Sequence, residues 1–338
     1  MAATFSALYA SRETVLPTMS RNFAPPSTVH TRQAITVALL LMLLWGSNYS
    51  LLKAVLTQIG PEALVFMRYL ITPACAVALL LWRYGLHWPR LERRDWIGLA
   101  GLAALGHVAH VNVMMQAMHL STPFSSALMS ALGPMFTLLL VRLLHSQHFS
   151  RTQVLGVVMA LVGVLVFLAD KLALMRTQGL GDLLLLLATL LFSAHTVAAT
   201  RLLSRHGVTV VMAYSTLLAM VPMLAINAPQ AMLIPWGSLP AVIWWALLWS
   251  LAVASFAGWL AWGWLNDHIG VPRSAPLLYL LPPVAGLISW MTLGEAFSSL
   301  KIVGAVMAGI GVAATQFGAA PSSVPSESPV DGRRHRSR

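Results

Sequence analysis

The feature that most limits the fold of this chain is an internal repeat. Residues 126–166 align without a gap on residues 274–314, and 13 of the 41 pairs are identical. Leucine-rich segments match by chance, so the kinds of residue that match carry more weight than the number of identities. Pro134 falls on Pro282, and a set of glycines and an alanine also match. The sequence therefore predicts an internal duplication, and a duplication changes how every other segment is interpreted.

Small residues form one face of the last helix in each copy. In each copy, three of them lie within about 60° of one another on a helical wheel. They are Gly156, Ala160 and Gly163 in the first copy and Gly304, Ala308 and Gly311 in the second. Such faces allow helices to approach closely in lipid, where packing replaces the hydrophobic driving force.

The composition excludes a soluble globular protein. Hydrophobic residues make up 58% of the chain, charged residues make up 9%, and the mean hydropathy is +0.75. Apolar runs of about 18 residues or more are long enough to cross a bilayer as helices. Ten such spans are expected, at residues 34–52, 62–82, 96–117, 124–144, 152–169, 181–201, 210–228, 240–262, 274–293 and 300–318. We expect an all-α polytopic membrane protein whose partners include the lipid bilayer.

The basic residues predict how these spans are oriented. The formal net charge is +11, which in a soluble protein would suggest nucleic-acid binding, but here the charges lie in loops between apolar spans. With a cytoplasmic N-terminus, sixteen Lys and Arg residues fall on the cytoplasmic side and four on the other side. This bias follows the positive-inside rule. It predicts cytoplasmic termini and no nucleic-acid partner.

Two copies of five spans must have opposite orientations, because five is an odd number. The expected fold is therefore ten transmembrane helices as two inverted five-helix repeats. The first repeat spans residues 34–169 and the second spans 181–318, with a periplasmic linker at 170–180 and disordered tails at 1–33 and 319–338. Inverted repeats of this kind are typical of secondary transporters, with the substrate site near the midplane between the copies.

Several motifs give the chain a resemblance to a known family. The first span contains LLWGSNYSLLK (residues 43–53), the second has Arg68 in FMRYL, and the ninth ends in LGEAF (residues 293–297). The third and fourth spans are joined by AMHLSTPFSSALMSALGPMF. Together these motifs resemble the EamA-like branch of the drug/metabolite transporter superfamily over residues 34–318. The resemblance implies a ten-helix carrier of the cell inner membrane that exports metabolites.

Two features depart from the family pattern. The first copy has Gln147 where the second has Glu295, although family members often carry Glu in both. The second copy also has a double proline, Pro282–Pro283, and a further Pro276. The resemblance makes Glu295 a candidate gate or ion-pair residue, and no partner for it can be named from the sequence.

Arg68 is the one charged side chain well inside an apolar span. A charge in hydrocarbon costs about 2.5–3.5 kcal/mol on insertion scales, so such a side chain normally faces a cavity, a partner or a substrate. Arg68 is therefore a candidate for binding substrate or holding a gate. The alternative is a structural role, in which the guanidinium reaches outward or pairs with a carbonyl.

The third span carries polar residues on two opposite faces. His107 and His110 share one face, and Asn112, Gln116 and His119 share the other. The Asn112 and Gln116 face is the preferred lining of a cavity, because amides both donate and accept hydrogen bonds. Hydrogen bonding between helices is the alternative. No metal site is expected, because the two histidines have no supporting carboxylate or thiolate in the spans.

Other polar and aromatic residues in the spans complete the candidate set. Asn48 and His195 occupy nearly equivalent places in the two copies, and each needs a hydrogen-bond partner in the bilayer. Phe256 and Trp259 form a candidate aromatic lining in the eighth span, with helix packing as the alternative. No acidic residue lies deep in a span, so His110 or His195 is the candidate for any proton coupling.

The leading hypothesis is a secondary transporter that works by alternating access. Its cargo would be a small polar or amphipathic, amino-acid-like metabolite, and Pro134 and Pro282 are candidate hinges of the moving bundle. No cofactor is expected, and no phosphate-binding GxxxxGK[ST] loop is present. The alternatives are a membrane-embedded enzyme and a receptor or scaffold that transports nothing. A homodimer is a further partner that the sequence leaves open.

Overall fold

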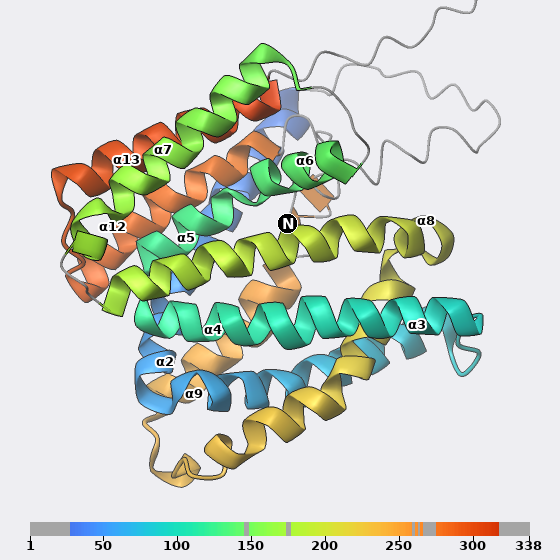
Figure 1. The fold of residues 1–338 in the computed structure, drawn as a ribbon. Helices are drawn as coiled ribbons and strands as arrows, with labels where there is room; N and C mark the ends of the chain where they lie inside the picture. Colours follow the sequence, from blue (N-terminus) through green and yellow to red (C-terminus); the bar gives the residue numbers. More distant parts are fainter. Residues whose placement is uncertain are drawn as a thin grey trace, which may run out of the picture.

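The protein is helical throughout the part that the computed structural model describes. This part comprises residues 28–144, 149–173, 177–258, 261–262, 264–265 and 275–317 (Figure 1). The elements are α2 (Thr28–Tyr84), α3 (Arg93–Leu102), η2 (Ala103–Ala109), α4 (His110–Leu120), α5 (Pro123–Ala131), α6 (Gly133–Leu144), α7 (Arg151–Ala173), α8 (Thr177–Ala231), η3 (Trp236–Ser238), α9 (Ala241–Leu248), η4 (Trp249–Ala257), η5 (Ala275–Leu280), α12 (Leu281–Leu293) and α13 (Ser299–Phe317). No strand occurs in these ranges, which agrees with the predicted all-α class.

Two helices, α2 and α8, are much longer than a single membrane crossing needs. They have 57 and 55 residues, and each is interrupted by one glycine with a non-helical backbone. Gly60 has φ 74° and ψ 169°, and Gly207 has φ 76° and ψ 166°. Only glycine adopts such positive φ values at little cost, so the chain can change direction at these two positions. Figure 1 shows the second arm of α8 returning across the molecule at an angle to the first.

The two turns are equivalent positions of the duplicated sequence. Gly207 follows Gly60 by 147 residues, close to the 148-residue offset of the repeat. Each turn separates two of the predicted spans. The arms of α2 contain the predicted spans 34–52 and 62–82, and the arms of α8 contain 181–201 and 210–228. The structure therefore joins as bent helices what the sequence predicted as separate ones.

Two rare π-helical segments also fall at equivalent places. The segment η2 follows α3 in the third predicted span, and η4 follows α9 in the eighth. π-helices are uncommon and occur often at functional sites. A matched pair of such irregularities indicates that both copies of the repeat kept the same local backbone.

The helices α7 and α13 cross at the small-residue faces that the sequence predicted to allow close approach. A Cβ atom on Gly163 would lie 2.4 Å from the backbone nitrogen of Ala308. One on Gly156 would lie 2.8 Å from the carbonyl oxygen of Gly311. In the reverse direction, a Cβ atom on Gly304 would lie 2.6 Å from the carbonyl oxygen of Gly163. The earlier residue of α7 meets the later residue of α13, so the two helices run antiparallel.

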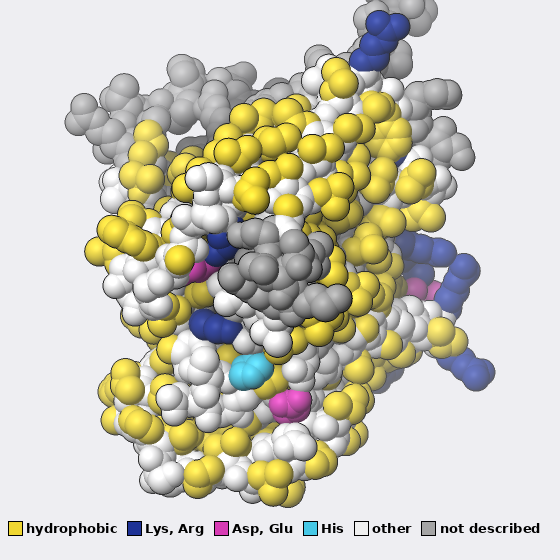
Figure 2. Space-filling model, turned by 60° about the vertical axis from the view of Figure 1, so that its left-hand side comes forward, with side chains coloured by type: hydrophobic (Ala, Val, Ile, Leu, Met, Phe, Trp, Pro, Cys, Tyr) yellow, Lys and Arg dark blue, Asp and Glu magenta, His cyan; other side chains and the backbone are white. Residues whose placement is uncertain are grey.

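The outer surface suits a hydrocarbon environment. In the described residues, six helices are long and apolar enough to cross a membrane. Large apolar side chains on α7 and α13, such as Leu155, Leu165 and Ile310, are more than half exposed. Figure 2 shows wide hydrophobic areas on one face of the molecule. Exposed apolar surface of this extent marks a contact with lipid or another protein, which here fits the membrane prediction.

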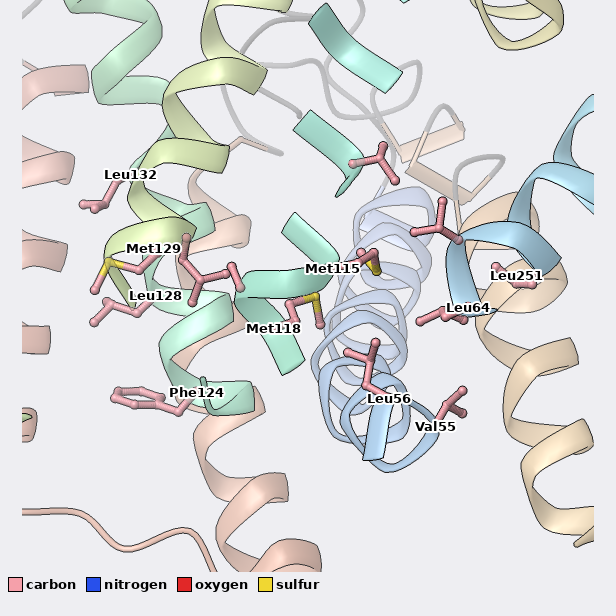
Figure 3. Close-up of a cluster of buried hydrophobic side chains, with 14 of the residues drawn as sticks. Val55, Leu56, Leu64, Met115, Met118, Phe124, Leu128, Met129, Leu132 and Leu251 are labelled. Carbon is pink, nitrogen blue, oxygen red and sulfur yellow. The ribbon is translucent and has the colours of Figure 1, made fainter. Parts of the chain in front are cut away.

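The main buried cluster joins both arms of α2, on either side of Gly60, to α4, α5 and α8. Methionines contribute strongly to it, with Met115 and Met118 from α4 and Met129 from α5 buried beside Leu56 and Leu64 (Figure 3). Unbranched methionine side chains fill irregular gaps between helices well. This packing fixes α4 between the arms of α2 and α8, and so positions the polar residues that α4 carries.

The helix α2 begins at Thr28, inside the segment 1–33 that was expected to be a tail. Extending an existing helix adds one hydrogen bond for each residue that is fixed, so a helix readily continues beyond its apolar part. Residues 1–27 and the C-terminal segment 318–338 lie outside the described residues.

Candidate functional site

A chain of hydrogen bonds crosses the third predicted span at His107. The hydroxyl of Tyr69 lies 2.8 Å from Nδ1 of His107, and the hydroxyl of Ser215 lies 3.3 Å from its Nε2. Ser215 already donates its one proton to the carbonyl of Met212. Therefore Nε2 of His107 donates to Ser215, and Nδ1 accepts the proton of Tyr69. This chain links the second arm of α2, the π-helix η2 and the second arm of α8.

The His195 ring packs against η2 beside His107. The two rings lie 6.4 Å apart between centroids at 85°. A Cβ atom on Gly106 would lie only 2.1 Å from Nδ1 of His195, so the glycine makes room for the imidazole. His195 is buried, and its Nδ1 has no hydrogen-bond partner in the described structure. A buried polar nitrogen without a partner is costly, which marks this ring for attention.

His110 lies one turn further along the same side. Its Nδ1 donates to the carbonyl oxygen of Ala188 at 2.9 Å, which fixes the proton on that nitrogen. Its ring lies 5.2 Å from the ring of Phe192 between centroids. The two histidines of the third span therefore both contact α8, as their shared face on the helical wheel predicted.

Arg68 is half-buried, and its side chain has no hydrogen bond or ion pair with a described residue. Arg68 directly precedes Tyr69, whose hydroxyl bonds His107. We call Arg68, His107, His110 and His195 the arginine–histidine cluster. The cluster combines one fixed positive charge with three imidazoles, and no carboxylate of the described residues pairs with that charge. Such a site can hold an anionic or hydrogen-bonding group of a small molecule.

The opposite face of the third span is occupied by contacts within the protein. Asn112 donates from Nδ2 to the carbonyl of Val108 at 2.7 Å and lies 3.2 Å from the sulfur of Met223. Gln116 donates to the carboxylate of Glu62 at the turn of α2. Both amides thus bridge α4 to neighbouring helices. Their use as a cavity lining stays a prediction, and the interhelical alternative has direct contacts in its favour.

The remaining candidates lie elsewhere. Asn48 is in the first arm of α2, on the other side of the Gly60 turn from Arg68, and its Oδ1 is buried without a described hydrogen-bond partner. Trp259 and the side chain of Phe256 lie outside the described residues, so the aromatic lining stays a prediction.

The hinge candidates lie where helices restart. In the first copy, α5 ends at Ala131 and α6 begins at Gly133, immediately before Pro134. In the second copy, the 3₁₀ helix η5 ends at Leu280, and Pro282 is the second residue of α12. Proline is tolerated in a first helical turn because the missing N–H would have no partner there. Both prolines therefore mark breaks, and their role as hinges stays a prediction.

Two ionic groups could not be found from the sequence, because their members are joined only by folding. Asp95 is 3% exposed and bonds Arg205 at 2.6 Å and His206 at 2.7 Å. Glu295 bonds Lys301 at 3.0 Å. The first group ties the start of α3 to the turn of α8, and the second closes the loop before α13.

Metal chemistry has no support in the described residues, where no three His, Cys, Asp or Glu side chains converge. A pocket of about 550 Å³ lies between α5, α12 and α13. Its walls are apolar, with Phe124, Leu287 and Trp290 among them. None of the residues that line this pocket belongs to the arginine–histidine cluster.

Comparison with known proteins identifies the family. A model of the EamA-like transporter family matches residues 32–169 and, a second time, residues 179–316. The chain belongs to this family. The double match agrees with the internal duplication, and the resemblance seen in the sequence motifs is confirmed. As an EamA-like transporter with several apolar helices, the chain is a multi-pass membrane protein.

Relatives of this EamA-like protein are named as transporters. A probable terminal-alkyne amino-acid exporter of Streptantibioticus cattleyicolor is 25% identical over 284 residues, which cover 83% of this chain and 92% of the relative. A probable amino-acid metabolite efflux pump of Salmonella typhimurium is 24% identical over 293 residues, 83% of this chain and 94% of the relative. The transporter YyaM of Bacillus subtilis, whose function is uncharacterised, is 21% identical over 79% of this chain and 88% of its own length.

A solved crystal structure has the same fold. It matches 85% of this chain and 98% of its own chain, with 19% sequence identity and a TM-score of 0.55. At this identity the match concerns the fold alone.

Proposed function

We propose that this protein is a secondary transporter of the cell inner membrane that exports a small polar or amphipathic, amino-acid-like metabolite. It would work by alternating access, with ten spans arranged as two inverted five-helix repeats and both termini in the cytoplasm. The arms of α2 and α8 on either side of Gly60 and Gly207 count as separate spans in this arrangement.

The observation that carries the proposal is the symmetry of the crossing between α7 and α13. Gly156 approaches Gly311, and Gly163 approaches Gly304. Ala308 also lies against Gly163, and Ala160 lies against Gly311. In the repeat, Gly163 corresponds to Gly311 and Gly156 to Gly304. Each contact is therefore the counterpart of the other under a two-fold exchange of the copies. An antiparallel, two-fold-related pair of helices is what an inverted repeat requires.

The distribution of charge supports the orientation. The ion group at Asp95, with Arg205 and His206, lies on the side that the positive-inside rule assigns to the cytoplasm. Glu295 and Lys301 lie on the opposite side by the same rule. The protein thus closes each end with charged side chains, while apolar surface covers the helices between them.

The arginine–histidine cluster supports a polar cargo. We propose that Arg68 binds an anionic group of the cargo, because its charge has no described partner in the protein. His110 and His195 would line the same path, and Pro134 and Pro282 would act as hinges. The names of the two amino-acid exporters among the relatives suggest the class of cargo.

Counterflow in liposomes tests the proposal. Purified protein is reconstituted into vesicles that are loaded with a mixture of unlabelled amino acids, and uptake of each labelled amino acid is followed without a pH or ion gradient. A carrier gives a transient accumulation that saturates with concentration. Vesicles without protein provide the background. The Gly309→Ala variant is the control for the effect of a substitution as such and should exchange amino acids at the wild-type rate, because a Cβ atom there meets no neighbour within 4 Å.

Two results would oppose the proposal. Chemical turnover of a substrate without movement across the membrane would favour a membrane-embedded enzyme. Binding of a metabolite with no exchange in either direction would favour a receptor or scaffold.

A further inference from the structure

A polar pocket opens at one end of the bundle, where loops from both copies of the repeat meet. Its volume is about 520 Å³, and its polar and charged walls include Lys53, Ser121, Thr122, Glu295, Ser298 and Lys301. We call it the Lys53 pocket. The loops that line it lie toward the left of Figure 1. Figure 2 turns this side of the molecule toward the viewer and shows basic and acidic side chains close together on it. Ligand pockets typically have volumes of about 300–1,000 Å³, so a small metabolite fits.

The ion pair between Glu295 and Lys301 forms one wall of the pocket. The side chains of Lys301 and Glu295 are only 7% and 5% exposed. Lys301 also donates to the carbonyl of Ala296 at 3.0 Å, and its ammonium lies 5.2 Å from the centre of the Phe297 ring. A buried pair of this kind is held rigidly and costs free energy to form, so it is weak evidence for a purely stabilising role.

Glu295 connects the two copies of the repeat. One carboxylate oxygen accepts from Lys301, and the other accepts from the backbone N–H of Phe124 at 3.3 Å. Phe124 lies in the first turn of α5, where the helix dipole favours a negative charge. Glu295 thus belongs to the second copy but is bonded to a helix of the first. A carboxylate oxygen accepts about two hydrogen bonds, so further bonds to Glu295 are available.

Lys53 is the second cation of the pocket, and no described carboxylate forms an ion pair with it. Its ammonium donates to the carbonyl oxygens of Met118 at 3.2 Å and His119. An ammonium group has three protons, so one of them has no described acceptor. Lys53 is half-buried and lines the same pocket as Glu295. Among the described charged residues that line the pocket, two are positive and one is negative, so these residues together carry a net charge of +1.

We propose that the Lys53 pocket binds the charged end of an amino-acid-like ligand, with the carboxylate on Lys53 and the ammonium on Glu295. This inference rests on the proposed function, because it makes the pocket a subsite at one end of the path of the exported metabolite, where the carboxylate binds at a different stage from its contact with Arg68. An anion neutralises the excess charge and takes the third proton of Lys53. The ligand ammonium uses the remaining acceptor capacity of Glu295. A ligand with both groups fits a pocket that offers both signs better than a simple anion does.

A binding measurement on the purified full-length protein tests the inference. The probes are the mixture of the twenty proteinogenic amino acids and the mixture of their methyl esters, which keep the ammonium group but lack the carboxylate. The readout is thermal stabilisation in detergent as a function of probe concentration. The acids should stabilise the wild-type protein, and the esters should require at least about tenfold higher concentration, because a charge-assisted hydrogen bond is lost.

Two variants at Lys53 provide the specificity control. Lys53→Gln should weaken binding of the acids by about ten- to a hundredfold. Lys53→Arg keeps the charge and the donors and should restore most of the affinity. Size-exclusion chromatography shows whether each variant is folded. Wild-type affinity in Lys53→Gln, equal stabilisation by acids and esters, or no stabilisation of the wild type by the acids would overturn the inference.

The counterflow assay separates this inference from the proposed function. If vesicles with wild-type protein exchange amino acids but Lys53→Gln binds them normally, the subsite is wrong and the transporter stands. If the protein exchanges only solutes without a carboxylate, the subsite is again wrong while transport is retained. If the acids bind through Lys53 but no solute is exchanged, the subsite stands and the proposed function fails.

Discussion

The close approach of the α7 and α13 backbones gives the sharpest prediction. In Gly163→Ala, the new methyl group would lie 2.4 Å from the backbone nitrogen of Ala308 and 2.8 Å from the carbonyl oxygen of Gly304. An ordinary van der Waals contact begins at 3.4 Å, so α7 and α13 would have to separate by about 1 Å. Both obstructing atoms belong to helix backbones, which cannot rotate away as a side chain can. Overpacking of this kind costs about 1–3 kcal/mol.

A matched variant removes the contribution of helix propensity. Alanine stabilises a helix interior relative to glycine by about 1 kcal/mol wherever the site is open. Gly309 lies in α13 close to the same crossing, but a Cβ atom there meets nothing within 4 Å. The difference in stability between Gly163→Ala and Gly309→Ala therefore isolates the clash, and we expect it to be about 1–3 kcal/mol. By symmetry, Gly311→Ala should behave like Gly163→Ala, because its Cβ atom would lie 2.3 Å from the backbone nitrogen of Ala160.

Thermal unfolding of the detergent-purified variants measures the difference. Each kcal/mol shifts the midpoint by a few degrees in a protein of this size. Gly309→Ala should melt at or slightly above the wild-type temperature, and the other two variants should melt several degrees below it. Equal midpoints for Gly163→Ala and Gly309→Ala would refute the close crossing. Loss of stability in Gly163→Ala without a similar loss in Gly311→Ala would refute its two-fold symmetry.

Three further predictions concern transport and the charged ends. Arg68→Gln should slow counterflow at least about tenfold. Arg68→Lys should give an intermediate rate, because lysine keeps the charge but not the forked donor geometry. Normal membrane insertion and wild-type counterflow rates in both variants would exclude a role of Arg68 in transport. Pro134→Ala combined with Pro282→Ala should slow exchange about tenfold and change stability by less than about 1 kcal/mol, and unchanged transport at full expression would make the prolines packing details. Asp95→Asn should destabilise the protein by about 1–3 kcal/mol, less than for a fully buried pair, since its arginine partner is 37% exposed. Glu92→Gln is the control for Asp95→Asn in the same unfolding assay, because Glu92 is 72% exposed and should change stability by less than about 1 kcal/mol.

The helical class and the close helix pair were predictable, because both follow from side-chain patterns. Long apolar runs require helices in lipid, where every backbone polar group must be bonded within its own segment. The spacing of Gly156, Ala160 and Gly163 predicted a face for close approach, and α7 meets α13 on that face. Both features depend on the spacing of residues along a single helix, and that spacing can be read from the sequence.

The backbone irregularities were harder to predict. Gly60 is followed by Pro61, a pair that marks a turn, but Gly207 is followed by Val208 and has no such signal of its own. Its equivalence to Gly60 becomes visible only when the repeat is aligned at an offset of 147. The π-helical segments have no recognised sequence signal. Gly106 illustrates why, since its role is to admit the ring of His195 from another helix.

The polar site also has features that the sequence predicts and features that only the fold reveals. Arg68 was evident as a charge inside an apolar run, and the structure adds that no described partner neutralises it. A helical wheel could not decide whether the face of Asn112 and Gln116 or the face of His107 lines a cavity. A wheel shows which residues share a face, but the neighbours of that face are set by tertiary packing. The hydrogen bonds that His107 makes with Tyr69 and Ser215 join helices that are far apart in the sequence.

The two copies of the repeat differ in the hydrogen bonds at the start of their last helices, α7 and α13. The helices α7 and α13 start alike, since the hydroxyl oxygen of Ser150 accepts from the backbone N–H of Gln153, and that of Ser298 accepts from the backbone N–H of Lys301. Gln153 and Lys301 are equivalent positions of the repeat, so the first copy has an amide where the second copy has a positive charge. Gln153 is fully buried and its amide nitrogen has no hydrogen-bond partner in the described structure, whereas Lys301 is held by Glu295. These equivalent helix starts thus differ in how firmly they are bonded, and under the proposed alternating-access mechanism such a difference would favour one of the two open states.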